Sequence, residues 1–163
     1  MTTLALPETL VELLRGAVER HRKPDALKYK QNRQWLPISS DELLERVRRV
    51  ALALDASGIG AGDRVALLAE SGPLWTIADF GVLATGAVNV PIYPTQPPQQ
   101  VEYILRESQP KAIFVSTRKQ LSRVGHVLEA FPDLRVITFE AGVEGAEDIA
   151  SLEAAGAEIE REA

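Results

Sequence analysis

The stretch Gly58–Pro94, GIGAGDRVALLAESGPLWTIADFGVLATGAVNVPIYP, decides the fold. Its apolar run Val65–Ala69 is short and bounded by turn residues, which predicts a fully buried strand. Pro73 suits the start of a helix because its missing N–H costs nothing there, and Leu74–Ala87 is apolar almost all round. We therefore expect protein on both faces of this helix. Val88–Ile92 predicts a second strand, and so short a connection implies a right-handed crossover between parallel strands.

The segments on either side continue this alternation. Strands over 26–30 and 34–38 are joined by a short turn and predict a hairpin. Ser39 and Glu42 have capping-box spacing and open a helix that runs to Gly58, with Arg46 on its solvated side. Further helices and strands are predicted at 10–21, 97–105, 111–115, 118–130 and 135–139. The pattern predicts an α/β fold: a doubly wound, mostly parallel sheet with flanking helices and an N-terminal β-hairpin.

The charge is distributed unevenly along the chain. The 163 residues carry a net charge of −5 and are 45% hydrophobic, enough for one globular core. Residues 140–163 hold eight acidic residues and one basic residue, whereas residues 1–139 hold 17 basic and 15 acidic ones. We expect an α/β unit over 1–139 and an acidic Ala/Glu-rich tail over 140–163, partly helical or disordered. Neither part is basic enough for a nucleic-acid surface, so no nucleic-acid partner is expected.

Metal and disulfide chemistry are not expected. The chain has no cysteine, and His21 and His126 are isolated, so no zinc set is present and both histidines are interpreted as surface residues. The start, MTTLALPETL, lacks the features of a secretory signal, and no stretch predicts a transmembrane segment. A cytoplasmic protein is expected.

Two features have both a functional and a structural interpretation. The glycine-rich run Gly58–Gly62 could be a phosphate-binding loop, but it follows a helix and precedes a strand, which favours a helix cap and turn. The basic region from Arg15 to Arg33 could meet an anionic membrane or the phosphates of coenzyme A. A solvated helix face is the interpretation that we favour.

Three pieces of the deciding stretch carry a family resemblance. They are Gly62-Asp63-Arg64-Val65, the helix end Gly86-Ala87-Val88, and Val90-Pro91-Ile92-Tyr93-Pro94-Thr95. In this order and spacing they resemble the N-terminal part of the adenylate-forming (AMP-binding) acyl-CoA synthetases, above all the long-chain fatty-acid CoA ligases. The resemblance covers roughly residues 10–139.

The resemblance implies a ligase reaction. Such enzymes use ATP to activate a fatty acid to an acyl-adenylate and then transfer the acyl group to coenzyme A. No stretch of this chain resembles the phosphate-binding motif T-S-G-T-T-G-x-P-K-G, so no catalytic residue is carried over. We expect an N-terminal fragment that is inactive alone and binds no cofactor, whereas ATP, Mg²⁺ and coenzyme A are implied for the full-length enzyme. The alternatives are a non-catalytic interaction module that completes a partner chain, and a free-standing nucleotide-binding α/β protein.

Candidate substrate-binding residues lie at the expected mouth of a cleft. Tyr93, Pro94, Thr95 and Ser71 follow strands, and ligands of open α/β sheets bind beyond the carboxyl ends of strands. The alternative is that the prolines end a strand and Tyr93 fills core. The family's usual asparagine is Ser71 here.

The expected partners follow from the same interpretation. They are the remainder of the ligase chain, a fatty acid as the substrate of the whole enzyme, and a second copy of the chain. That homodimer would cover apolar surface exposed along 74–87 or on the adjoining sheet face. We also expect a peripheral association with membranes.

Overall fold

The structure is a computed structural model, and it describes residues 7–162. Most of the N-terminal start used above to judge a signal segment lies outside this range. The helices are α1 (Leu10–Arg20), α2 (Ser40–Ala56), α3 (Pro73–Ala84), α4 (Pro98–Ser108), α5 (Arg118–Leu128) and α6 (Ile149–Glu162). The strands are β1 (Leu27–Gln31), β2 (Gln34–Ile38), β3 (Arg64–Leu68), β4 (Val88–Ile92), β5 (Ala112–Val115), β6 (Arg135–Thr138) and β7 (Glu147–Asp148).

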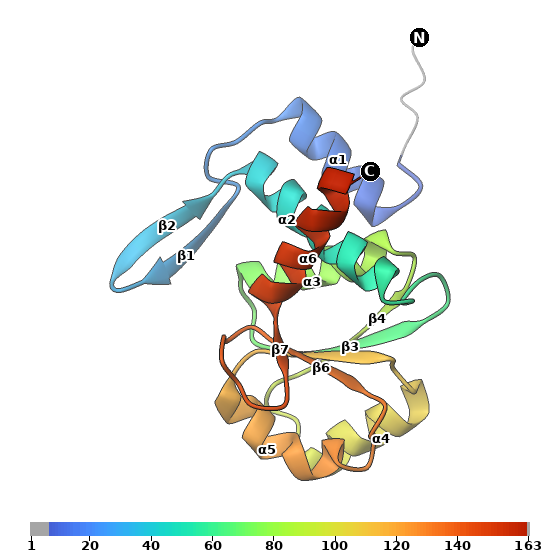
Figure 1. The fold of residues 1–163 in the computed structure, drawn as a ribbon. Coiled ribbons are helices and arrows are strands. Elements are labelled where there is room, and N and C mark those ends of the chain that lie inside the picture. The colour runs from blue at the N-terminus through green and yellow to red at the C-terminus, as the bar shows by residue number, and fades with distance from the viewer. Residues whose placement is uncertain (1–6, 163) are drawn as a thin grey trace.

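The predicted fold class is confirmed. Five parallel strands form one sheet in the order β4-β3-β5-β6-β7, and β1 and β2 form a separate antiparallel hairpin. Helices α2, α3 and α6 cover one face of the sheet, and α4 and α5 cover the other (Figure 1). The sheet is therefore doubly wound, with a hydrophobic core on each side.

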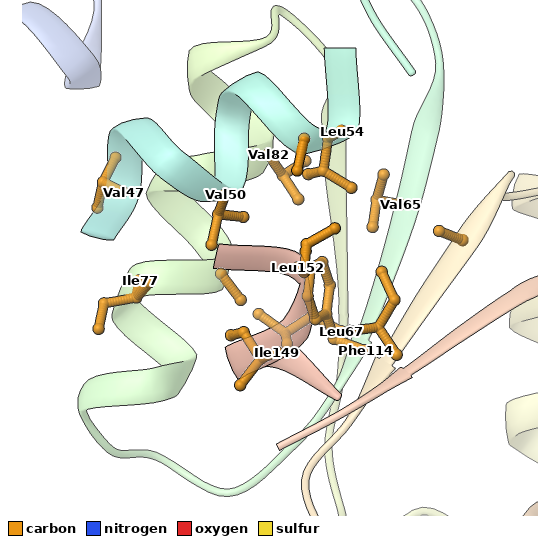
Figure 2. Packing of buried hydrophobic residues seen from close by; sticks show 14 of the residues in the cluster. Val47, Val50, Leu54, Val65, Leu67, Ile77, Val82, Phe114, Ile149 and Leu152 are labelled. Atoms are coloured by element: carbon orange, nitrogen blue, oxygen red, sulfur yellow. The ribbon is translucent and has the colours of Figure 1, made fainter. Parts of the chain in front are cut away.

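The larger core lies between the sheet and the layer of α2, α3 and α6. Figure 2 shows the side chains that meet there: Val47, Val50, Leu54, Val65, Leu67, Ile77, Val82, Phe114, Ile149 and Leu152. Gly81 allows α3 to approach α2 closely, since a methyl group built on it would lie 2.4 Å from Cγ1 of Val50. Helix α3 is thus packed closely against α2 in this core, whereas β4 of the same β3–α3–β4 unit forms one edge of the sheet.

Helix α3 is covered on one face more completely than on the other. Ile77, Ala78, Gly81 and Val82 are buried, whereas Leu74, Trp75, Phe80 and Leu83 are only half-buried and Ala84 is exposed. Every residue of α3 except Ala84 is thus at least partly covered, and Leu74, Trp75 and Phe80 pack against the larger core. No large apolar side chain of α3 is among the strongly exposed ones in residues 7–162, which lie on α1, β2, β4, the loop after β4, and α4.

The glycine run after α2 is a helix cap and turn, as predicted. Gly58 has a φ of 81°, its N–H donates to the carbonyl of Asp55 (2.8 Å), and the N–H of Ile59 donates to the carbonyl of Leu54 (3.0 Å). This pair of bonds is a Schellman motif, which ends a helix at a left-handed glycine. The amides of the cap are thus committed to the helix end.

The acidic C-terminal segment forms more structure than its composition indicates. Strand β7 adds to the edge of the sheet, and α6 continues to Glu162, whereas the composition of residues 140–163 predicts only a partly helical or disordered tail. Helix α6 packs on α2 and buries Ile149 and Leu152 in the larger core. The division of the chain at residue 139 stays a prediction.

Candidate functional site

The loops at the carboxyl ends of the strands form the candidate site. After β3 the chain enters α3 on one face of the sheet, and after β5 it enters α5 on the other face. Because β3 and β5 are neighbours, their loops diverge and open a crevice between them. Ligands of doubly wound sheets bind at this kind of switch point.

A first hollow of about 530 Å³ lies where β3 and β4 end. It brings together Ser71, Tyr93, Pro94 and Thr95, the four residues predicted from the sequence, and Trp75 of α3. The side chain of Tyr93 is 76% exposed, so the alternative that it fills core is wrong. The structure therefore gathers the predicted residues at one solvent-facing wall, which we call the β4 wall.

Helix α5 holds the β4 wall in place. The Nε2 amide of Gln120 donates to the carbonyl of Pro94 at 3.1 Å, and the guanidinium of Arg123 donates to the same carbonyl and to that of Gln96 (3.1 Å). Gln120 is buried, and Thr117 caps α5 by accepting from its N–H (3.0 Å). The loop after β4 is thus fixed by side chains from the far face of the sheet.

A second hollow of about 500 Å³ lies at the switch point itself. Its lining includes Tyr29 of the hairpin, Arg46 of α2, Ser116 after β5 and Glu140 after β6. Glu70 and Trp75 line both hollows, which therefore adjoin along the loop after β3. Most of the remaining lining is apolar: Ile38, Pro73, Leu74 and Phe139.

The polar groups of the second hollow are largely engaged by the protein. Arg46 donates three hydrogen bonds of 2.8–3.2 Å to the carboxylate of Glu153, and Glu140 accepts from the N–H of Arg118 at 2.7 Å. The buried hydroxyl of Ser116 has no partner in the described part of the chain. The hollow thus has a largely apolar lining, with an exposed carboxylate on Glu70 and a buried, unpartnered hydroxyl on Ser116.

Sequence reasoning missed the second hollow. Ser116 directly follows the predicted strand 111–115, so the rule that sites lie at strand ends could have found it. Arg46 was assigned to the solvated side of its helix, and this is wrong because its partner Glu153 comes from α6, 107 residues away. No local pattern indicates that contact.

Neither the histidines nor the glycine run contributes to the two hollows in residues 7–162. His21 and His126 are exposed, as expected, and line neither hollow. No group of acidic or histidine side chains in this range could hold a metal ion. Gly58 ends α2, and the N–H of Gly60 donates to the carboxylate of Asp63 at 3.0 Å, so these amides of the glycine run are engaged within the chain.

One carboxyl group on α3 lies near the β4 edge of the sheet. Half-buried Asp79 accepts a hydrogen bond from the amide of Asn89. Burial raises the pKa of Asp79, and the bond from Asn89 only partly offsets this. The group lines neither hollow, so we assign it no role in binding.

A larger hollow, of about 710 Å³, lies at the opposite end of the strands. Lys111 and Arg135, at or before the starts of β5 and β6, line it together with Phe131 and Arg106. Because open α/β sheets bind ligands at the carboxyl ends, we place the candidate site at the two hollows described above.

Comparison with known families identifies the chain. The sequence model of the family described as "AMP-binding enzyme" matches residues 14–161. The chain belongs to this family. A long-chain-fatty-acid CoA ligase of Mycobacterium bovis is 34% identical over 126 residues, which are 77% of this chain and 21% of that protein. One of Drosophila melanogaster is 28% identical over 135 residues, 80% of this chain and 20% of that protein. The chain thus spans about a fifth of the length of these relatives.

Solved structures show the same fold. An anthranilate CoA ligase in complex with anthranoyl-AMP superposes with a TM-score of 0.80 at 22% identity, covering 93% of this chain and 29% of that one. An acetoacetyl-CoA synthetase of Streptomyces lividans superposes with a TM-score of 0.76 at 22% identity, covering 88% and 24%. At these identities the likeness concerns the fold alone. None of its helices in residues 7–162 has the length and apolar character to cross a bilayer.

Proposed function

We propose that the chain is the N-terminal part of a long-chain fatty-acid CoA ligase, which converts a fatty acid with ATP to an acyl-adenylate and then to acyl-CoA. The observation that carries this is the family match over residues 14–161, joined to 34% identity with a ligase of that specificity. The remainder of the ligase chain is the partner that completes the enzyme.

In this proposal the β4 wall contributes one side of the cleft in which fatty acid and coenzyme A meet. Ser71, Tyr93, Pro94 and Thr95 are the substrate-contacting residues. Their gathering at one hollow, and the fixing of Pro94 by α5, support a positioning role. The phosphates of ATP and the Mg²⁺ ion are held by polypeptide outside this sequence, because no stretch of it resembles the phosphate-binding motif.

Three further properties belong to this proposal. Alone, the chain is inactive and binds no cofactor. It resides in the cytoplasm and associates peripherally with membranes. A second copy can cover the exposed Val88 of the edge strand β4 and form a homodimer, which sedimentation over a concentration series would detect.

Reconstitution tests the proposal. The chain is mixed with the remaining four fifths of the M. bovis relative, and formation of long-chain acyl-CoA is measured. We expect activity only from the mixture. Tyr93→Ala should raise the KM for fatty acid or coenzyme A by about tenfold, as the loss of a substrate contact worth about 1.4 kcal/mol would.

Tyr103→Ala is the matched control, because Tyr103 of α4 is a similarly exposed tyrosine that lines neither hollow. Tyr103→Ala should leave the KM for both substrates within twofold of the value for the unchanged chain. Acyl-CoA formation by the chain alone would contradict the proposed inactivity. Equal effects of the two substitutions would contradict the role of the β4 wall.

A further inference from the structure

The β1–β2 hairpin has two faces of different character. Alternation along a strand sends neighbouring side chains to opposite faces, and the register pairs Leu27 with Ile38 and Tyr29 with Leu36 on one of them. These residues are buried or half-buried, and Tyr29 and Ile38 line the second hollow. The inner face of the hairpin is thus a wall of the candidate site.

The outer face carries lysines, a proline and a tryptophan. The same register pairs Lys28 with Pro37 and Lys30 with Trp35, and all four residues are exposed. Trp35 is 66% exposed although it is among the most apolar residues of the chain. The hairpin projects from the layer of helices (Figure 1), and the exposure of all four residues shows that this face is open to solvent within the described chain.

The surroundings of Trp35 are strongly cationic. Residues 20–35 contain six Lys or Arg residues and one acid, Asp25, in a chain whose overall charge is −5. Asp25 accepts from Lys28 at 2.8 Å, and this hydrogen bond holds the pKa of Asp25 below its usual value. Lys30 and Arg33 make no ion pair within residues 7–162.

We propose that the outer face of the hairpin docks on an anionic phospholipid bilayer. Tryptophan prefers the interface between headgroups and acyl chains, and each lysine near an anionic surface adds attraction. In this orientation the membrane contacts the outer face of the β1–β2 hairpin. The inner face of the same hairpin lines the second hollow. The inference rests on the proposed function, since a long-chain fatty acid partitions into bilayers and would then reach the site from the lipid.

Vesicle binding tests the inference without any ligase activity. The 163-residue chain is titrated with vesicles of equal phosphatidylcholine and phosphatidylglycerol, and with vesicles of phosphatidylcholine alone, at low salt. We expect co-sedimentation with the anionic vesicles only, a blue shift of tryptophan emission, and release as salt rises beyond about 0.2 M. Trp35→Phe should abolish the blue shift while the circular dichroism spectrum is unchanged, because the side chain is exposed.

Charge variants provide the matched control. Lys28→Gln and Lys30→Gln should each weaken binding to anionic vesicles by about fivefold. Lys119→Gln, an exposed lysine on α5 in the opposite layer, should change it by less than twofold. Equal binding to neutral vesicles, equal loss in all three variants, or no blue shift would overturn the inference. If reconstitution succeeds and vesicle binding fails, this inference and the peripheral membrane association fall, and the assignment of the chain to a ligase stands.

Discussion

The backbone of Gly156 in α6 lies directly against the backbone of Arg49 in α2. A methyl group built on Gly156 would stand 2.0 Å from the carbonyl oxygen of Arg49 and 2.6 Å from its carbonyl carbon. The obstacle is backbone, so no change of rotamer can relieve it. The contact therefore sets how closely the acidic C-terminal helix packs on the core.

Gly156→Ala should force α6 away from α2 and lower the free energy of unfolding by about 2–3 kcal/mol, as overpacking of a tight interface does. Urea denaturation measures this. Gly125→Ala in α5 is the control, since nothing lies within 4 Å of a methyl group there and alanine favours helix, so stability should stay equal or rise by up to about 1 kcal/mol. An equal loss in both variants would show that α6 is not held by this contact.

The pair of Arg46 and Glu153 should couple α2 to α6 energetically. Their side chains are only 22% and 13% exposed, so a double-mutant cycle with Arg46→Met and Glu153→Gln should give a coupling of about 1–3 kcal/mol. The cycle for Arg15 and Glu19, which are 71% and 61% exposed, should give less than about 0.5 kcal/mol. Equal couplings would contradict the packed geometry of α6.

Asp79 should make stability depend on pH. Because burial raises its pKa above the ordinary 3.8, the folded protein holds this proton more tightly than the unfolded chain, and stability falls as pH rises through the raised pKa. Asp79→Asn should therefore stabilise at pH 7, and the gain should vanish below the ordinary pKa. Urea denaturation at both pH values checks this. Asp133→Asn, at an exposed loop position, controls for the change of net charge. An equal gain in stability from Asp133→Asn would rule out the burial of Asp79 as the cause.

Local patterns were sufficient where neighbours in sequence make the structure. Pro73 opens α3, and Ser39 caps α2 by accepting from the N–H of Glu42 at 3.1 Å. Local patterns also predicted the grouping of the four residues at the β4 wall. The carboxyl ends of parallel strands meet at one edge of the sheet, so residues that follow these strands lie near one another. The length and packing of α6 could not be predicted, since its partners on α2 are about 100 residues distant and its own composition is polar.

The second hollow also could not be predicted from local sequence patterns. It joins side chains from the hairpin, α2 and the loops after β3, β5 and β6. Their proximity depends on the strand order, and the sequence leaves that order open. The sequence also predicts the hairpin without showing which of its faces turns toward the site, because that depends on how the hairpin packs on the body.

Fatty-acid-dependent ATP–pyrophosphate exchange tests the central claim most directly. The purified 163-residue chain is incubated with ATP, Mg²⁺, labelled pyrophosphate and a long-chain fatty acid, alone and with the remaining part of the M. bovis relative. The account predicts exchange only in the mixture, because one wall of the cleft cannot stabilise the charge that builds on phosphorus. Exchange by the chain alone, above the rate without protein, would contradict it.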